Sequence, residues 1–134
     1  MMKIATLATL TVMLFLFPVL SNVSAQELRQ YGNASWYGNR FHGKTTASGE
    51  SYDMHEFTGA HRDLPFGTLI KVKNLRNGRE VVVRVNDRGP FIKSRIVDLS
   101  RAAASMLGIV SRGTARVSIE VISFPDGSTP GSTL

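Results

Sequence analysis

The segment 80–91 restricts the fold more than any other part of the sequence. It begins Glu-Val-Val-Val-Arg-Val, an apolar run typical of a buried β-strand. It ends at Gly89-Pro90, a pair that neither a helix interior nor a central strand tolerates well. The segment therefore predicts a buried strand that stops abruptly and holds Asp87 at its mouth. An aspartate in this position either caps its own turn or serves as a reactive group on a rigid scaffold.

The first 25 residues have the three parts of a secretory signal peptide. Lys3 gives a positive start, residues 4–20 are almost free of polar groups, and Val23-Ser24-Ala25 is a small-x-small cleavage site. The alternative is a membrane-anchoring helix, since residues 4–23 are just long enough to span about 30 Å of hydrocarbon. A proline and two polar residues late in this stretch favour cleavage. We therefore expect no stable membrane anchor, and a periplasmic or secreted protein.

Composition bounds the remaining possibilities. Residues 26–134 suffice for one domain with a modest core, and the formal net charge of the whole chain is +6. A basic exported domain suits a polyanionic or wall-like partner, although such charge also serves solubility. The chain has no cysteine, which excludes disulfides and thiolate-bound zinc. Its three histidines lack the spacing of metal ligands, so we expect neither a metal site nor a cofactor.

Aromatic residues mark the first structured segment of the mature chain. Residues 31–38 read Tyr-Gly-Asn-Ala-Ser-Trp-Tyr-Gly, which suits a short strand punctuated by glycines. Trp36 and Tyr37 are adjacent and must point to opposite faces of a strand, so we expect one in the core and the other available to stack on a sugar. Residues 39–53 form a long loop rich in glycine and hydroxyl groups, and such loops are usually functional. Glu50 follows a Ser-Gly pair in this loop, where a turn can present its carboxylate.

The remaining segments predict a mainly β protein. Residues 68–73 alternate apolar and polar side chains, and Asn77-Gly78 is a hairpin signal that joins them to the strand at 80–85. Further expected elements are a buried strand at 95–99, a helix at 101–107 between Ser100 and Gly108, and a strand at 115–122. From residue 123 the chain is too poor in apolar groups to pack, so we expect disorder. Short strands with one or two short helices make a closed barrel the natural architecture.

Six motifs occur in one order along the chain. They are Ala34-Ser-Trp-Tyr-Gly38, Thr46-Ala-Ser-Gly-Glu50, Ala60-His61, Leu64-Pro-Phe-Gly-Thr68, Val85-Asn-Asp-Arg-Gly-Pro-Phe91 and Arg95-Ile-Val-Asp-Leu-Ser100. This pattern resembles the rare lipoprotein A (RlpA-like) family of bacterial septal lytic transglycosylases over about residues 31–122. The resemblance implies a six-stranded double-psi β-barrel at 26–122, related to the barrels of expansins and barwin-like proteins. It would lie between the signal peptide at 1–25 and the tail at 123–134.

The resemblance also implies an activity and a site. Lytic transglycosylases cleave the MurNAc–GlcNAc β-1,4 bond of peptidoglycan, and the C6 hydroxyl of MurNAc attacks its own C1 to give a 1,6-anhydro end. The motifs match the catalytic carboxylates to Glu50 and Asp87, with His61 in the same site. Asp98 matches an acidic position shared with expansin-like relatives. Residues expected to contact the glycan are Trp36, Tyr37, Thr46, Tyr52 and Arg88.

The roles of the acidic residues follow from what this reaction needs. One carboxyl group can protonate the leaving oxygen and then accept the proton of the C6 hydroxyl. Asp87 at the rigid strand end is our candidate acid/base, and Glu50 would stabilise developing charge or set the pKa of its partner. The sequence leaves the reverse assignment open. Asp98 is either a third catalytic acid or a structural group, and His61 either orients a carboxylate or is a satisfied histidine.

Two other functions compete with the enzyme. A non-catalytic expansin-like module would bind polysaccharide and keep similar acids, but the presence of both Glu50 and Asp87 favours catalysis. Nucleic-acid binding rests only on the basic charge, and the sequence has no recognition helix or aromatic-basic motif, so we do not expect it. Many family members carry a lipidation cysteine and a peptidoglycan-binding SPOR repeat, and this sequence has neither. We therefore expect a soluble monomer that acts on peptidoglycan glycan strands.

Overall fold

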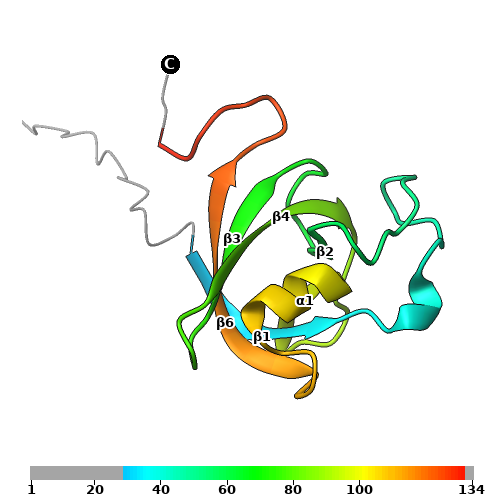
Figure 1. The fold of residues 1–134 in the computed structure, drawn as a ribbon. Coiled ribbons are helices and arrows are strands. Elements are labelled where there is room, and N and C mark those ends of the chain that lie inside the picture. Colours follow the sequence, from blue (N-terminus) through cyan, green and yellow to red (C-terminus); the bar gives the residue numbers. More distant parts are fainter. Residues whose placement is uncertain (1–28, 132–134) are drawn as a thin grey trace, which may run out of the picture.

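A computed structural model describes residues 29–131, so the expected signal peptide at 1–25 lies outside the described residues. In this part of the chain, six strands close into a barrel accompanied by one α-helix and one short 3-10 helix (Figure 1). The strands are β1 (Arg29–Trp36), β2 (Thr58–Ala60), β3 (Leu69–Asn74), β4 (Glu80–Asp87), β5 (Arg95–Leu99) and β6 (Thr114–Ser123). The helices are η1 (Asn39–Phe41) and α1 (Arg101–Leu107). The mainly β barrel predicted from the sequence is confirmed.

The barrel mixes parallel and antiparallel pairs. Its strand order is β1-β5-β2-β4-β3-β6, and closure brings β6 back to β1. The pairs β1–β5 and β2–β4 are parallel, and the other four are antiparallel. Closure leaves none of these strands with an open edge. Together with the antiparallel β2–β5 pair, the two parallel pairs place the C-terminal ends of β1, β5, β2 and β4 in one row across the barrel.

Sequence reasoning missed β2. Its three residues, Thr58–Ala60, are all buried, but the run is too short to show any periodicity. The strand forms because β4 pairs with it in parallel on one side and β5 pairs antiparallel on the other. Gly59 suits this position because a Cβ there would come within 3.2 Å of the Asp98 carbonyl oxygen. Tertiary pairing therefore creates this strand.

Alternate side chains of the strands fill the barrel. The fully buried set consists mainly of Val, Ile and Leu from β3 to β6, including Ile70, Val72, Val83, Val85, Val97, Leu99, Val117 and Ile119. In β4 the alternation is plain, since Val83 is 1% exposed and its neighbour Val82 is 44% exposed. In the valine run seen in the sequence, Val81 and Val83 thus face the core and Val82 faces the surface.

Helix α1 packs beside β4 and β1. It buries Ala103, Ala104 and Leu107. The Ser100 hydroxyl accepts a hydrogen bond from the Ala103 amide (3.2 Å), and Gly108 ends the helix in the left-handed conformation at φ 72°. Both ends of the predicted helix are confirmed. No helix among residues 29–131 is both long and apolar enough to cross a membrane.

The packed part of the chain extends past residue 122, where sequence reasoning placed the start of a disordered tail. Strand β6 continues to Ser123, and Phe124 is half-buried against the core. The Phe124 amide donates to the Ser128 carbonyl at 2.8 Å and closes a turn. Pro125 lies so close to Gly67 that a Cβ on that glycine would be 3.3 Å from it. A single aromatic side chain supplies the packing that the composition of the tail did not predict.

The two valines of β4 give a matched stability test. Val83→Ala removes two buried methyl groups and leaves a cavity, so we expect a loss of about 1.5–3 kcal/mol in the free energy of unfolding. Val82→Ala on the exposed face should change it by less than about 0.5 kcal/mol. Chemical denaturation of the two variants measures both values. Equal losses would contradict the assignment of Val83 to the barrel interior.

Candidate active site

Asp87 is the last residue of β4 and its carboxylate accepts three hydrogen bonds. Oδ1 accepts from the backbone amides of Ala47 and Arg88, each at 2.9 Å. Oδ2 accepts from the hydroxyl of Tyr37 at 2.8 Å. The side chain is half-buried. These donors hold the carboxylate in one orientation at the end of the strand.

The loop predicted at 39–53 contains a tight hairpin that rests on the end of β4. Thr45 and Ser51 form an isolated antiparallel bridge, and Gly49 takes the φ of 90° that its turn requires. The Ser48 amide donates to the carbonyl of Asn86 at 3.2 Å. With the bond from the Ala47 amide to Asp87, this contact fastens the hairpin to the strand.

Glu50 projects from this hairpin into an ion pair. The Nη1 of Arg84 lies 2.8 Å from both carboxylate oxygens, and the amide Nδ2 of Asn86 donates to Oε2 at 3.0 Å. These hydrogen bonds, with that of Arg84 the larger, hold the pKa of Glu50 below its usual value. Although its side chain is 44% exposed, Glu50 therefore stays ionised to lower pH than a free glutamate.

Glu50 and Asp87, predicted separately from two motifs, are both fastened to the same end of β4. Asn86 binds the first through its side chain and precedes the second in the chain. The hairpin that carries Glu50 also donates the Ala47 amide to Asp87. One end of β4 therefore organises both carboxylates.

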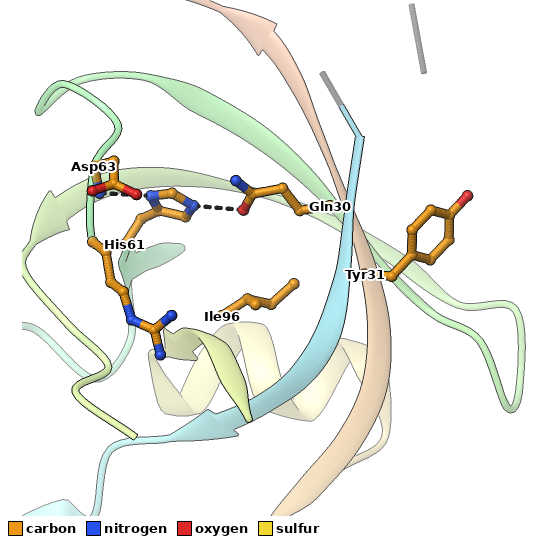
Figure 2. A pocket seen from close by; sticks show the side chains of 6 residues that line it. Gln30, Tyr31, His61, Asp63 and Ile96 are labelled. Atoms are coloured by element: carbon orange, nitrogen blue, oxygen red, sulfur yellow. Dashed lines mark hydrogen bonds between the residues drawn. The ribbon is translucent and has the colours of Figure 1, made fainter. Parts of the chain in front are cut away.

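His61 lies apart from this pair and is buried. Its Nδ1 accepts from the amides of Asp63 and Leu64, both at 3.1 Å, so its Nε2 is the nitrogen that donates to Oε1 of Gln30 at 2.9 Å. Burial is the main cause that lowers the pKa of His61, which favours the neutral ring. Figure 2 shows the ring between Asp63 and Gln30. Its backbone amide donates to the Asp87 carbonyl at 3.1 Å, so His61 reaches that residue through the main chain.

A pocket of about 280 Å³ lies beside His61 (Figure 2). Its lining is formed by Gln30, Tyr31, His61, Arg62, Asp63 and Ile96. Neither Glu50 nor Asp87 belongs to this lining. The pocket and the carboxylate pair are separate features of the surface.

Asp98 is on the same level of the barrel as Asp87, two strands away. Ser35, Asp98, Ala60 and Asp87 form one row across β1, β5, β2 and β4. Neighbouring strands are about 4.8 Å apart, so the main chains at the two aspartates are about 10 Å apart. The Ser35 hydroxyl donates to Oδ1 of Asp98, and Nε of Arg95 lies 3.4 Å from the same oxygen. These contacts support the structural interpretation of Asp98.

The adjacent aromatic residues Trp36 and Tyr37 are both half-buried but have different neighbours, and a sugar contact for Tyr37 stays a prediction. Trp36 packs against the core, with the guanidinium of Arg101 5.7 Å from its ring. Tyr37 is on the other side, where its hydroxyl reaches Asp87 and its ring lies 4.9 Å from that of Tyr52. Tyr52 is only 4% exposed. Tyr37 is therefore the aromatic side chain that touches the carboxylate pair.

The other expected glycan contacts also serve the scaffold. The Thr46 hydroxyl donates to the Glu50 carbonyl at 2.9 Å. The Arg88 guanidinium lies 3.9 Å from the centre of the Phe66 ring and donates to the Leu64 carbonyl at 2.9 Å. Both side chains thus fasten loops beside the site, and a glycan contact for them stays a prediction.

Sequence reasoning missed three residues that shape the site. Arg84 and Asn86 bind Glu50. The signal for Arg84 was its charge, which interrupts a run of valines in the sequence. Arg62 is the third, and its guanidinium donates to the carbonyls of Pro90 (2.6 Å), Arg95 (2.7 Å) and Ile92. It fastens the loop that follows Asp87. Residues 29–131 contain no group of three or more His, Asp or Glu side chains that could hold a metal ion.

The structure defines a small closed β-barrel protein with two anchored carboxylates at one end of β4, and comparison with known proteins gives the family. Residues 29–119 match the model of the family described as lytic transglycolase. The chain belongs to this family, in its RlpA-like branch.

Curated relatives share more than half of their residues with this chain over the barrel. The endolytic peptidoglycan transglycosylase RlpA of Neisseria meningitidis is 57% identical over 104 residues, which are 78% of this chain and 43% of that protein. The protein of the same name from Pseudomonas aeruginosa is 54% identical over 98 residues, 73% of this chain and 29% of that protein. This chain therefore spans less than half the length of these relatives.

Solved structures with lower identity share the fold. A mutant expansin of Clavibacter michiganensis in complex with cellohexaose superposes with a TM-score of 0.58 at 22% identity, covering 78% of this chain and 58% of that one. The Streptomyces papain inhibitor gives a TM-score of 0.57 at 23% identity, covering 69% of this chain and 93% of that one. At this identity the likeness concerns the barrel alone.

The ion pair of Glu50 can be tested by titration. In Arg84→Gln the main cause of the lowered pKa is removed, so the Glu50 carboxyl should titrate at higher pH than in the wild type. Carboxyl ¹³C NMR measures this directly. The stabilisation from this pair is present above the usual glutamate pKa and is lost as the pH falls through the lowered one.

Asp126 provides an internal control for that titration. Its pKa is lowered by hydrogen bonds from Ser128 rather than by an arginine, so it should titrate identically in both proteins. An unchanged Glu50 titration in Arg84→Gln would show that the ion pair does not form in solution.

Proposed function

We propose that this protein is an endolytic lytic transglycosylase that cleaves the MurNAc–GlcNAc β-1,4 bond of peptidoglycan and leaves 1,6-anhydroMurNAc ends. The observation that carries this proposal is the pair formed by Asp87 and Glu50 at the end of β4. Relatives named endolytic peptidoglycan transglycosylase, 54–57% identical over this barrel, support it. The features of residues 1–25 support action outside the cytoplasm.

The environments of the two carboxylates favour one division of roles. A general acid must carry a proton at the working pH, and the hydrogen bonds from Arg84 and Asn86 oppose protonation of Glu50. Glu50 therefore suits the stabilisation of positive charge that develops at C1 of the sugar. Asp87, which has no cationic side chain bound to its oxygens, is left as the acid/base. This difference supports Asp87 as the acid/base, one of the two assignments that the sequence left open.

In the proposed reaction Asp87 acts twice. Its protonated carboxyl gives the proton to the glycosidic oxygen as the C1–O bond breaks and GlcNAc leaves with a new hydroxyl. The C6 hydroxyl of MurNAc then bonds to C1, and its proton passes to the Asp87 carboxylate. The enzyme returns to its starting state and no water is consumed. The nucleophile belongs to the substrate, unlike in the two-carboxylate hydrolases.

His61 and Asp98 take supporting parts in this proposal. His61 shapes the turn after β2 and holds the Asp87 main chain, while Asp98 ties Ser35 to Arg95. Two of the residues expected to contact the glycan bond to the acidic residues: Tyr37 to the Asp87 carboxylate and Thr46 to the Glu50 carbonyl.

Isosteric variants test the chemistry. Asp87→Asn and Glu50→Gln keep the side-chain volume and remove the charge, so each should fold and lose glycan cleavage by about 10²–10⁴-fold. Mass spectrometry of fragments released from purified peptidoglycan measures both the rate and the chemistry of the new ends. Asp63→Asn, an exposed acid with no bond from its carboxylate to either site residue, is the matched control and should retain activity.

Other products would contradict the proposal in defined ways. Reducing ends in place of 1,6-anhydro ends would identify a hydrolase that uses water. Binding to peptidoglycan without release of fragments by the wild type would favour the expansin-like binding module, whose fold relative is solved with cellohexaose.

A further inference from the structure

The two oxygens of the Asp87 carboxylate have chemically different partners. Both partners of Oδ1 are backbone amides, from Ala47 and Arg88, and an amide N–H can only donate. The partner of Oδ2 is the phenol of Tyr37, whose hydroxyl can donate or accept. This difference decides where a proton on Asp87 can reside.

A proton on Oδ1 would face two donors and would break at least one of the two backbone hydrogen bonds. A proton on Oδ2 leaves these bonds intact, because the Tyr37 hydroxyl can rotate and accept from it. Unsatisfied donors in a half-buried site are costly, so the second arrangement is strongly preferred. We propose that Tyr37 is a positioning residue that confines the exchangeable proton of Asp87 to Oδ2, the oxygen that exchanges it with the sugar. This inference rests on the proposed acid/base role of Asp87.

The surroundings of Tyr37 keep its hydroxyl in place. Its ring packs near the rings of Tyr52 and Phe41, with centroids at 4.9 and 6.0 Å, and its backbone amide donates to the Leu99 carbonyl at 2.9 Å. Burial and then the bond to Asp87 raise the pKa of Tyr37, so the phenol keeps its proton. It therefore remains a hydroxyl that can serve either protonation state of its partner.

The other ionisable groups near Asp87 are engaged elsewhere. Arg84 binds Glu50, His61 binds Gln30, and Arg62 and Arg88 donate to loop carbonyls. On β5, Asp98 pairs with Arg95. Lys44 lies near the Phe41 ring, and the Asp63 side chain is exposed. Within residues 29–131, Tyr37 is the side chain that bonds to Oδ2.

Replacing Tyr37 by phenylalanine tests the proposal and keeps the ring stack. The Asp87 carboxyl loses the hydroxyl that bonds to Oδ2, so its proton is no longer held at that oxygen. We expect kcat to fall by about 10–100-fold with little change in KM, since a bond to a charged group is lost. The matched control is Tyr31→Phe, an exposed tyrosine at 56%, which should leave both readouts unchanged.

Site-specific incorporation of a fluorinated tyrosine at position 37 gives a test of opposite sign. Its more acidic phenol donates more strongly without changing the packing, so the carboxyl ¹³C resonance of Asp87 should move in the opposite direction to that in Tyr37→Phe. Carboxyl ¹³C NMR follows Asp87 in every variant without any need for activity. Opposite shifts in the two variants would support the proposal even if the wild type released no glycan, an outcome that overturns only the proposed function. A lower rate with an unmoved Asp87 carboxyl ¹³C resonance would overturn the inference itself.

Discussion

The seating of the 45–51 hairpin on the end of β4 is the contact on which the candidate site depends. Two main-chain donors of the hairpin reach the strand, one to the Asn86 carbonyl and one to the Asp87 carboxylate. The same hairpin carries Glu50 back to Arg84 and Asn86. Because strand β4 is paired on both sides within the barrel, it is a rigid base for these bonds. A loop that is long in sequence is thus held by a few directed hydrogen bonds.

Two neighbouring carboxylates are tolerated because they are compensated by different means. Glu50 is matched by the full charge of Arg84, whereas Asp87 is matched by the dipoles of two amides and a phenol. Full charge suits a group that stays an anion, and dipoles suit a group that must change its protonation state. Two further arginines, Arg62 and Arg88, donate hydrogen bonds to loop carbonyls and so stabilise the loops near the two carboxylates. These three arginines therefore have structural roles.

The sequence pattern was enough to predict the helix and strands that have a clear side-chain period or capping residues. The alternating strands, the hairpin turn and the helix between Ser100 and Gly108 follow from side-chain period and capping. The short strand β2 did not follow, because its pairing on both sides supplies what its sequence lacks. Phe124 was overlooked for a related reason: one aromatic side chain in a polar tail packs only because the barrel offers it a surface.

The sequence by itself determined that Asp87 ends a buried strand, that Glu50 belongs to a turn-rich loop, and that Trp36 and Tyr37 face opposite ways. Strand geometry and turn chemistry are local, so these statements need no fold. Only the tertiary structure decided that Arg84 binds Glu50, that Tyr37 bonds to Asp87, and that His61 reaches the site through its main chain. These partners are far apart in sequence, and the closed barrel with the hairpin seated on it brings them within hydrogen-bonding distance, where direction and burial set their chemistry.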